Sequence, residues 1–421
     1  MADMGLNPFR RGVNQALAAM PGVRAVRRPV TPGSTEQFTL YYVRSGPLTA
    51  HPVVIIPGGP GVASIHHYHA MRRRAADLGL DVVMVEHRGV GMSRHDDSGA
   101  DLPPEAMTVE QVIDDIVAVL DDLGVDTAVL YGTSYGSYLA AGTGVRHPHR
   151  VRAMILDSPV LSADDLEAMR TALRGLLLGG AVPGAETVAP KVRRLLDAGL
   201  LSSSAAEVAA YAYSYGGVAL LNRLLDLLLT GHTLLWRAMI AISKLTLRPV
   251  PYHNEVDLVG RIAFRELDYA GEPDGLPLDP AAALLAMAEQ IPGRRPEFEG
   301  EPYDLVTELP RFDWPTVVIS GGRDLTTPPP VAERIAGLVP DAQLVSLPTA
   351  AHSALDTREV AALRITKTVV RGRAAELPAR SAELDALPAN PSMRMLVGLL
   401  GAAAAVEAAL PASRRAPGPI A

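Results

Sequence analysis

The sequence predicts an α/β protein in which a mostly parallel sheet carries helices on both faces and a helical domain interrupts the sheet. Short apolar runs alternate with helical patterns across residues 36–160. Residues 161–309 then read as helices rich in Leu and Ala, without a strand pattern, and the strand pattern returns after residue 310. Alternation of strands and helices is typical of a parallel sheet. Helices inserted into such a pattern indicate a cap domain.

Four continuous apolar runs in the first α/β segment are expected to be strands buried on both faces. They lie at residues 53–56, 82–85, 128–131 and 153–156. A helix is expected over 108–123, because its apolar residues fall on one stripe. Thr108 and Gln111 form a capping pair at its start, and Gly124 closes it.

The second α/β segment is expected to contain two strands, at 316–320 and 343–347, with a helix that begins near Pro328 between them. The paired Arg10 and Arg11 are expected in a solvated arm at the start of the chain. The expected organisation is therefore an N-terminal arm (1–35), a first core part (36–160), a helical cap (161–309), a second core part (310–371) and an Ala- and Pro-rich C-terminal appendage (372–421).

The composition of the chain argues against several classes of binding function. The chain has 421 residues, 48% of them hydrophobic, which is enough for a large core. The 39 Lys and Arg against 46 Asp and Glu give a net charge of −7, which argues against nucleic acid as a partner. There is no Cys, so a disulfide framework and thiolate metal sites are excluded. No signal-like or membrane-spanning apolar segment is evident, so a cytoplasmic location is expected.

A nucleophile motif follows the third predicted strand. It reads Gly132-Thr133-Ser134-Tyr135-Gly136, directly after the strand at 128–131 and before a helix expected over 137–145. At a sharp strand-to-helix turn, G-x-S-x-G exposes the serine hydroxyl above the edge of the sheet. The alternative is a glycine-rich turn with an inactive serine.

An acid and a base follow the next predicted strands in the order that such a serine requires. Asp324 lies just past the strand at 316–320, and His352 lies just past the strand at 343–347. Because the carboxyl ends of parallel strands share one edge, the sequence predicts a catalytic triad of Ser134, Asp324 and His352. Asp157 also follows a strand and is an alternative acid; otherwise it caps its own turn.

A second glycine-rich loop supplies candidate oxyanion donors. Pro57-Gly58-Gly59-Pro60-Gly61 follows the strand at 53–56, and glycine lets backbone N–H groups approach a developing negative charge. The candidate donors are the backbone amides of Gly59 and Tyr135, unless the loop is only a tight turn. No Gly-Lys-Ser/Thr sequence follows, so a phosphate loop is excluded.

Two other clusters carry simpler interpretations. His66 and His69 lie three residues apart, but no further ligand is evident, so no metal is expected. The basic run at 72–74 is interpreted as a solvated helix face.

Three segments resemble the α/β-hydrolase family. They read Pro57-Gly58-Gly59-Pro60-Gly61 with Ser64, Glu86-His87-Arg88-Gly89-Val90-Gly91-Met92-Ser93, and Tyr131-Gly132-Thr133-Ser134-Tyr135-Gly136-Ser137-Tyr138-Leu139-Ala140. Within the family they are similar to proline iminopeptidases and to actinobacterial tripeptidyl-aminopeptidase-like hydrolases. The resemblance covers roughly 36–160 and 305–370, and it implies an α/β-hydrolase fold with a helical cap and no cofactor.

The sequence departs from the proline iminopeptidase pattern at three places. Pro57 stands where those enzymes usually carry His, which favours the tripeptidyl branch. Glu86-His87 replaces the more usual Asp-Pro or Asp-Gln, and Ala351 precedes His352 where Gly is more usual. These differences leave the triad intact.

The resemblance implies a serine aminopeptidase that acts on short peptides with a free N-terminus. Acidic cap residues would bind the substrate amine; Glu266 and Asp268 are candidates, as are Glu255 and Asp257, each of which is otherwise an ordinary surface charge. One alternative is a carboxylesterase or lactonase, because a Leu-rich cap could also line an apolar acyl pocket. Another is a catalytically silent binding protein on the same scaffold.

Overall fold

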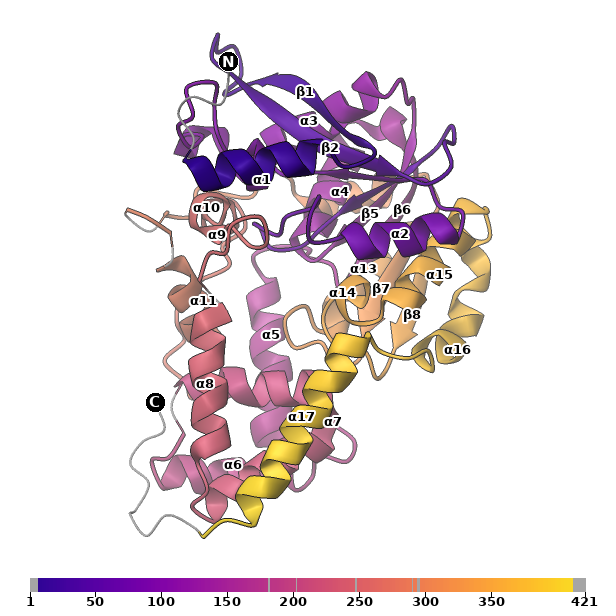
Figure 1. Cartoon of the computed structure of the whole chain (residues 1–421). Coiled ribbons are helices and arrows are strands. Elements are labelled where there is room, and N and C mark those ends of the chain that lie inside the picture. Colours follow the sequence, from indigo (N-terminus) through magenta and orange to yellow (C-terminus); the bar gives the residue numbers. More distant parts are fainter. Residues whose placement is uncertain are drawn as a thin grey trace.

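The computed structural model describes residues 7–411 except 181, 202, 247, 290, 294 and 295. An eight-stranded sheet with the order β1-β2-β4-β3-β5-β6-β7-β8 lies in the upper part of the molecule in Figure 1. The strands are β1 (Val23–Pro29), β2 (Gln37–Ser45), β3 (Val53–Ile56), β4 (Val82–Val85), β5 (Ala128–Thr133), β6 (Val151–Asp157), β7 (Thr316–Gly321) and β8 (Gln343–Leu347).

The six strands from β4 to β8 are parallel, and β1 and β2 add an antiparallel edge. Every residue of β3, β5 and β7 is buried, which explains why these strands read as continuous apolar runs. Because the central strands are parallel, the loops after β3, β5, β7 and β8 all lie at one edge of the sheet. The predicted mostly parallel α/β sheet is confirmed.

Helices cover both faces of the sheet. Alternate strand residues face two separate apolar cores: Val54 and Leu130 pack with α3, α4 and α13, whereas Val53 and Val129 pack with α1, α2, α15 and α16. The Thr108 hydroxyl accepts a hydrogen bond from the Gln111 amide at 3.2 Å and so caps α3, as predicted. These helices are α1 (Pro8–Ala18), α2 (His69–Asp77), α3 (Val109–Asp122), α4 (Tyr135–Arg146), α13 (Pro329–Leu338), α14 (Ala354–Thr357), α15 (Glu359–Val370) and α16 (Ser381–Asp385).

The described part of the first 35 residues differs from the expected solvated arm. It forms α1 and the edge strand β1, which pairs with β2 along its whole length. The Arg10 guanidinium is largely buried against Glu255, and Arg28 Nε donates to Asp115 Oδ1 at 2.8 Å. Buried carboxylates far along the chain therefore hold these arginines, and local sequence gives no sign of such partners.

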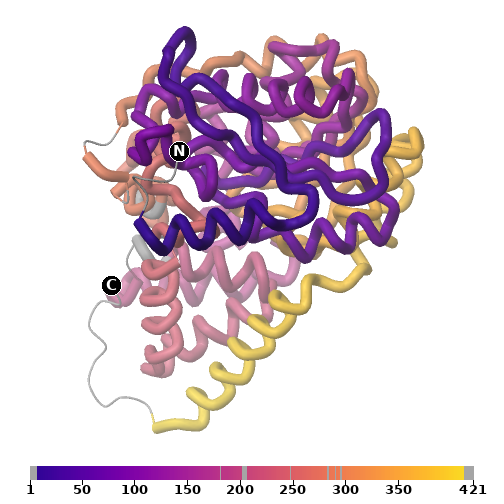
Figure 2. Tube along the Cα trace, turned by 45° about the horizontal axis from the view of Figure 1, so that its top comes forward, coloured from indigo at the N-terminus to yellow at the C-terminus, as the bar shows by residue number. Residues whose placement is uncertain are grey.

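A helical cap lies against the sheet domain, below it in Figure 1. Its own apolar core joins α5, α6, α7 and α8, and it also includes Ala404 of α17. Figure 2 shows α17, in yellow, leaving the sheet domain and running along the cap, so this helix of the C-terminal appendage becomes part of the cap. These helices are α5 (Asp165–Arg174), α6 (Val188–Asp197), α7 (Ser203–Leu229), α8 (Leu234–Thr246), α11 (Ala281–Ala288) and α17 (Pro391–Ala408).

Part of the segment expected as cap folds onto the sheet domain instead. Leu258 and Ile262 belong to the same apolar core as α3 and α4. They lie on the first two of three short helices, α9 (Val256–Val259), α10 (Arg261–Arg265) and α12 (Leu305–Glu308). Within the described residues, no named strand occurs between β6 and β7, as the sequence indicates.

No single helix among the described residues has the length and apolar character needed to cross a membrane. The pair 206–229 and 234–246, bent by 119°, passes that test by length and composition only.

Candidate active site

Ser134 occupies the turn between β5 and α4 in a backbone conformation that side chains rarely adopt. Its φ is 52° and its ψ is −125°, which is outside the favoured regions for a residue with a Cβ. A Cβ at residue 132 would lie 2.2 Å from the Gly136 carbonyl oxygen, and one at residue 136 would lie 2.2 Å from the Ile56 carbonyl oxygen. The two glycines of the motif are therefore required by close backbone contacts.

Asp324 and His352 lie side by side, as the sequence predicts. His352 Nδ1 is 2.8 Å from Asp324 Oδ2, and the Asp324 side chain is fully buried. Asp324 Oδ1 also accepts hydrogen bonds from the amides of Thr326 and Thr327, at 2.8 and 2.9 Å. The carboxylate therefore has a fixed orientation, and Nε2 is the ring nitrogen of His352 that remains for another partner.

The electrostatics of the pair favour its charged state. Burial alone would raise the pKa of Asp324, but the charge and hydrogen bond of His352 hold it below its ordinary value. Burial would lower the pKa of His352, but Asp324, with smaller contributions from Asp157 and Asp356, raises it above its ordinary value. An imidazole in this setting is a stronger base than one in water.

Two of the three predicted triad residues, Ser134 and His352, line one cavity. A cavity of about 290 Å³ is lined by Ser134, His352 and Gly59, together with residues of α5 and α11 and the loop after α10. The cap helices lie between Ser134 and His352 in the sequence, and they form the other wall of the cavity.

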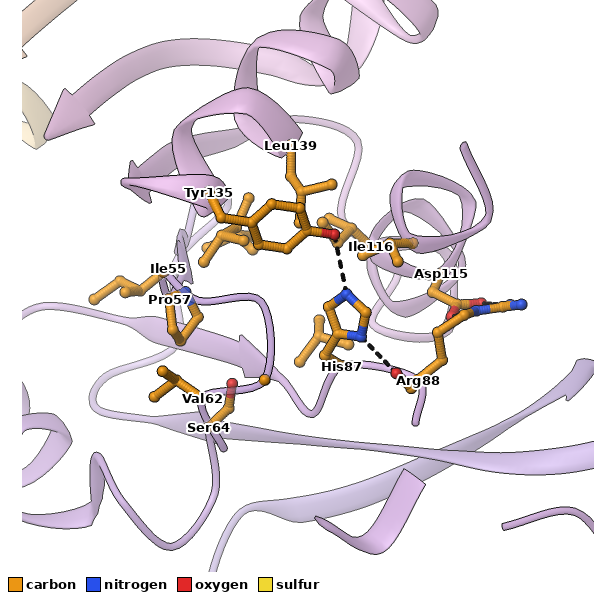
Figure 3. Close-up of a pocket in the computed structure, with 16 residues that line it drawn as sticks. Ile55, Pro57, Val62, Ser64, His87, Arg88, Asp115, Ile116, Tyr135 and Leu139 are labelled. Carbon is orange, nitrogen blue, oxygen red and sulfur yellow. Dashed lines mark hydrogen bonds and ion pairs between the residues drawn. The ribbon is translucent and has the colours of Figure 1, made fainter. Parts of the chain in front are cut away.

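The candidate oxyanion loop lies against Ser134. A Cβ at residue 58 would be 3.1 Å from Ser134 Cβ, and Gly59 lines the cavity with a φ of 119°. The Tyr135 side chain turns toward His87, whose Nε2 is 3.2 Å from the Tyr135 hydroxyl (Figure 3). This buried anchor fixes the first residue of α4, whose backbone amide is the second candidate donor.

Two buried charged side chains, Glu86 and Arg72, hold the segment that follows that loop, and sequence reasoning missed them. Glu86 Oε2 accepts from the amides of Ser64 and Ile65 at 2.6 and 3.0 Å. Arg72 is fully buried and donates to the carbonyls of the same two residues, both at 2.6 Å. Burial raises the pKa of Glu86 to about 7 and lowers that of Arg72 to about 10. The interpretation of Arg72 as part of a solvated face is therefore wrong. The sequence feature that could have indicated this arrangement is Glu86, which stands where Asp is more usual in the family.

Asp157 has a structural role, but one that differs from the predicted capping of its own turn. Its Oδ1 accepts from the Ala354 amide, and its Oδ2 accepts from the Leu355 amide and the Tyr131 hydroxyl, all at 2.9 Å. Burial raises its pKa to about 6. Asp157 thus holds the segment that follows His352, and Asp324 is the carboxylate that contacts the imidazole.

Of the four acidic candidates for amine binding, one lies at the cavity and three lie away from it. Asp268 lines the cavity. Glu266 does not, because its Oε2 accepts from the Val109 amide at 2.8 Å and its Oε1 binds Arg265. The expectation that Glu266 lies in the site is therefore wrong. The backbone N–H groups at the start of α3 have no partner within the helix, and the buried Val109 amide uses Glu266 as its acceptor.

Glu255 and Asp257 also lie away from the cavity. Both contact the Arg94 guanidinium, Asp257 at 2.9 Å, and Glu255 also accepts from the Gly91 amide. Their charges serve to join α9 to the loop after β4.

Asp165 lines the cavity and was not anticipated. Its Oδ2 accepts from the amides of Leu161 and Ser162 at 2.7 and 3.3 Å, and burial raises its pKa to about 7, with Glu301 adding to the effect. The capping pattern from Ser162 to Asp165 at the start of α5 was a usable signal. Among the residues with described positions, no group of His, Cys, Asp or Glu could hold a metal ion.

Comparison with known proteins agrees with this topology. Residues 51–179 match the sequence model of a family described as the alpha/beta hydrolase fold. The chain has the α/β-hydrolase fold. A proline iminopeptidase of Clostridioides difficile is 30% identical over 129 residues, covering 30% of this chain and 42% of that protein. A proline iminopeptidase of Arabidopsis thaliana is 30% identical over 140 residues, covering 32% and 34%.

These matches span less than half the length of either relative. Among solved structures, a thermophilic esterase from Thermogutta terrifontis superposes with a TM-score of 0.44 at 20% identity, over 83% of this chain and 99% of that chain.

Proposed function

We propose that this α/β-hydrolase-fold protein is a serine hydrolase with Ser134 as nucleophile, His352 as general base and Asp324 as its partner. The observation that carries the proposal is the 2.8 Å contact between His352 and Asp324 in the cavity that Ser134 lines. A serine hydroxyl is a weak nucleophile, and an adjacent base oriented by a third group activates it.

The free ring nitrogen of His352 determines the course of the proposed reaction. Because Nδ1 of His352 contacts Asp324, Nε2 takes the Ser134 proton as Oγ bonds to the substrate carbonyl carbon. The resulting oxyanion accepts hydrogen bonds from the amides of Gly59 and Tyr135, each worth about 10²–10³ in turnover. His352 then gives its proton to the leaving group as the scissile bond breaks, and water releases the acyl group from Ser134 with His352 again as base.

The substrate class we favour is a short peptide or amino-acid amide with a free amino terminus. The cavity-lining carboxyl group of Asp268 supports it, because a carboxylate is the natural partner of a substrate ammonium. The similarity to proteins named proline iminopeptidase points the same way.

An apolar ester is the second candidate. Several aliphatic side chains from α5 and α11 line the same cavity, among them Leu166, Met169 and Leu284. Such a wall suits an apolar acyl group as well as an aminoacyl group.

Matched substrates separate the two candidates. We expect an unblocked aminoacyl-nitroanilide to be cleaved at least tenfold faster than its N-acetylated form, and Asp268→Asn to reduce that ratio. Cleavage of nitrophenyl esters alone would reject the peptidase and support the esterase. In either case Ser134→Ala should abolish turnover.

A further inference from the structure

A second cavity adjoins the first at His352. It has a volume of about 230 Å³ and shares four lining residues with the first cavity, namely Met169, Leu284, Thr326 and His352. Neither Ser134 nor Gly59 lines it. The imidazole therefore stands between two chambers, of which only the first contains the nucleophile and the candidate oxyanion loop.

Aromatic and aliphatic side chains of the cap form much of the second chamber. Tyr211 and Tyr215 lie one turn apart on α7 with ring centroids 4.5 Å apart, and Leu173, Ala210 and Leu325 add apolar surface. Tyr211 is 41% exposed, which places it at the rim, whereas Tyr215 is partly buried.

Two acidic residues complete the lining without making the chamber a cation site. Asp279 accepts from Arg170 Nε at 3.1 Å, so its charge is already paired within the cap. Burial raises the pKa of Glu207, which disfavours its charged form, and Ser243 hydrogen-bonds to it.

A break in α7 places this helix against the loop that carries Asp324. Gly217 has φ 67° and ψ −171° within the helix, and a Cβ there would lie 3.0 Å from Arg323 Cζ. The helix therefore lies against the residue that precedes Asp324. Burial raises the pKa of Tyr215, and Tyr211 and the nearby charge of Asp324 add to the effect.

Acyl transfer assigns different places to the two parts of a substrate. The carbonyl carbon bonds to Ser134 and its oxygen faces the loop that holds Gly59, whereas the leaving group takes its proton from the imidazole. We propose that the second chamber is the leaving-group subsite, built for an aromatic or branched apolar group such as the side chain that follows the cleaved bond of a peptide. This inference rests on the proposed serine hydrolase function.

The test compares substrates that differ only after the scissile bond. We would measure kcat/KM for a prolyl-glycine amide and a prolyl-phenylalanine amide, with methyl and benzyl esters of one acyl group as the parallel pair. We expect the bulky leaving group to be favoured at least tenfold, because each buried methylene group contributes roughly 10-fold or more to discrimination.

Filling the chamber should remove that preference. Ala210→Trp places an indole in the second chamber, and we expect it to lower kcat/KM for the bulky substrate at least tenfold while the small substrate changes far less. Ala238→Trp is the matched control, because Ala238 is exposed on α8 of the same cap and lines neither chamber. Tyr211→Ala, at the exposed rim, gives a second variant that should reduce the preference without threatening the fold.

Labelling of Ser134 by a fluorophosphonate probe in every variant distinguishes failure of the subsite proposal from failure of the hydrolase proposal. If Ser134 is labelled and wild type shows no leaving-group preference, or Ala210→Trp slows both substrates equally, the subsite is rejected and the hydrolase proposal stands. If no substrate is cleaved and Ser134 is not labelled, both proposals are rejected.

Discussion

The Nδ1 atom of His352 lies 2.8 Å from Asp324 Oδ2, while Asp324 Oδ1 accepts from the Thr326 and Thr327 amides. The two carboxylate oxygens therefore have different partners. Oδ1 ties the acid to the backbone of its loop, and Oδ2 receives the imidazole N–H and also accepts from the Thr327 hydroxyl at 2.9 Å. Together they select the tautomer in which Nε2 is free to accept a proton.

Asp324→Asn should disable this arrangement without unfolding the protein. The asparagine oxygen can still accept from Thr326 and Thr327, which leaves its NH₂ group facing His352 Nδ1 and favours the wrong tautomer. We expect kcat to fall by about 10⁴. Steady-state kinetics together with thermal melting would show activity lost at nearly unchanged stability.

Asp157→Asn provides the contrast. Three donors converge on its two oxygens, and an amide NH₂ would oppose one of them. We expect the free energy of unfolding to fall by about 1–3 kcal/mol, with kcat per folded molecule within tenfold of wild type. A loss of kcat as large as that of Asp324→Asn would show that Asp157 acts in the chemistry.

The pH dependence of kcat/KM should report the raised pKa of His352. Only the neutral imidazole can accept the Ser134 proton, so activity falls as pH drops through this pKa. Because Asp324 raises the pKa, the acidic midpoint should lie above the ordinary value of about 6.5. In Asp324→Asn burial remains but the charge is gone, so any residual activity should show a lower midpoint. A midpoint that does not move would argue against this pair.

Gly136→Ala should disrupt the turn that carries Ser134. The new Cβ would lie 2.2 Å from the Ile56 carbonyl oxygen and 2.5 Å from that of Pro57, so backbone of the candidate oxyanion loop would have to shift. We expect a loss of about 3 kcal/mol or more. Gly12→Ala, on α1 with no atom within 4 Å of the new Cβ, should be neutral or stabilising by up to about 1 kcal/mol. Equal denaturation midpoints for the two variants would contradict the packing argument.

The parts predicted correctly from sequence depend on local patterns and topology. Buried parallel strands read as continuous apolar runs, so β3, β4 and β8 were expected within their observed bounds. The loops that carry Asp324 and His352 follow such strands, so a shared sheet edge was enough to bring the two side chains together.

The parts that were missed depend on partners distant in the chain. β1 reads as a charged arm until its arginines meet Asp115 and Asp97. Sequence alone indicates that Glu266 is a surface charge, whereas in the fold it accepts a hydrogen bond at the start of α3. Likewise, α17 shows no local sign that it completes the core of the cap. Each of these contacts joins segments whose proximity only the complete fold determines.

The most direct measurement is covalent labelling by a fluorophosphonate, followed by peptide mass spectrometry. The probe reacts with a serine hydroxyl only where a neighbouring base activates it. We predict a single modification on Ser134, absent in Ser134→Ala, whose kcat should also fall by on the order of 10⁶. Full turnover by Ser134→Ala, or an unlabelled wild-type protein, would contradict the account and favour a silent binding protein on this fold.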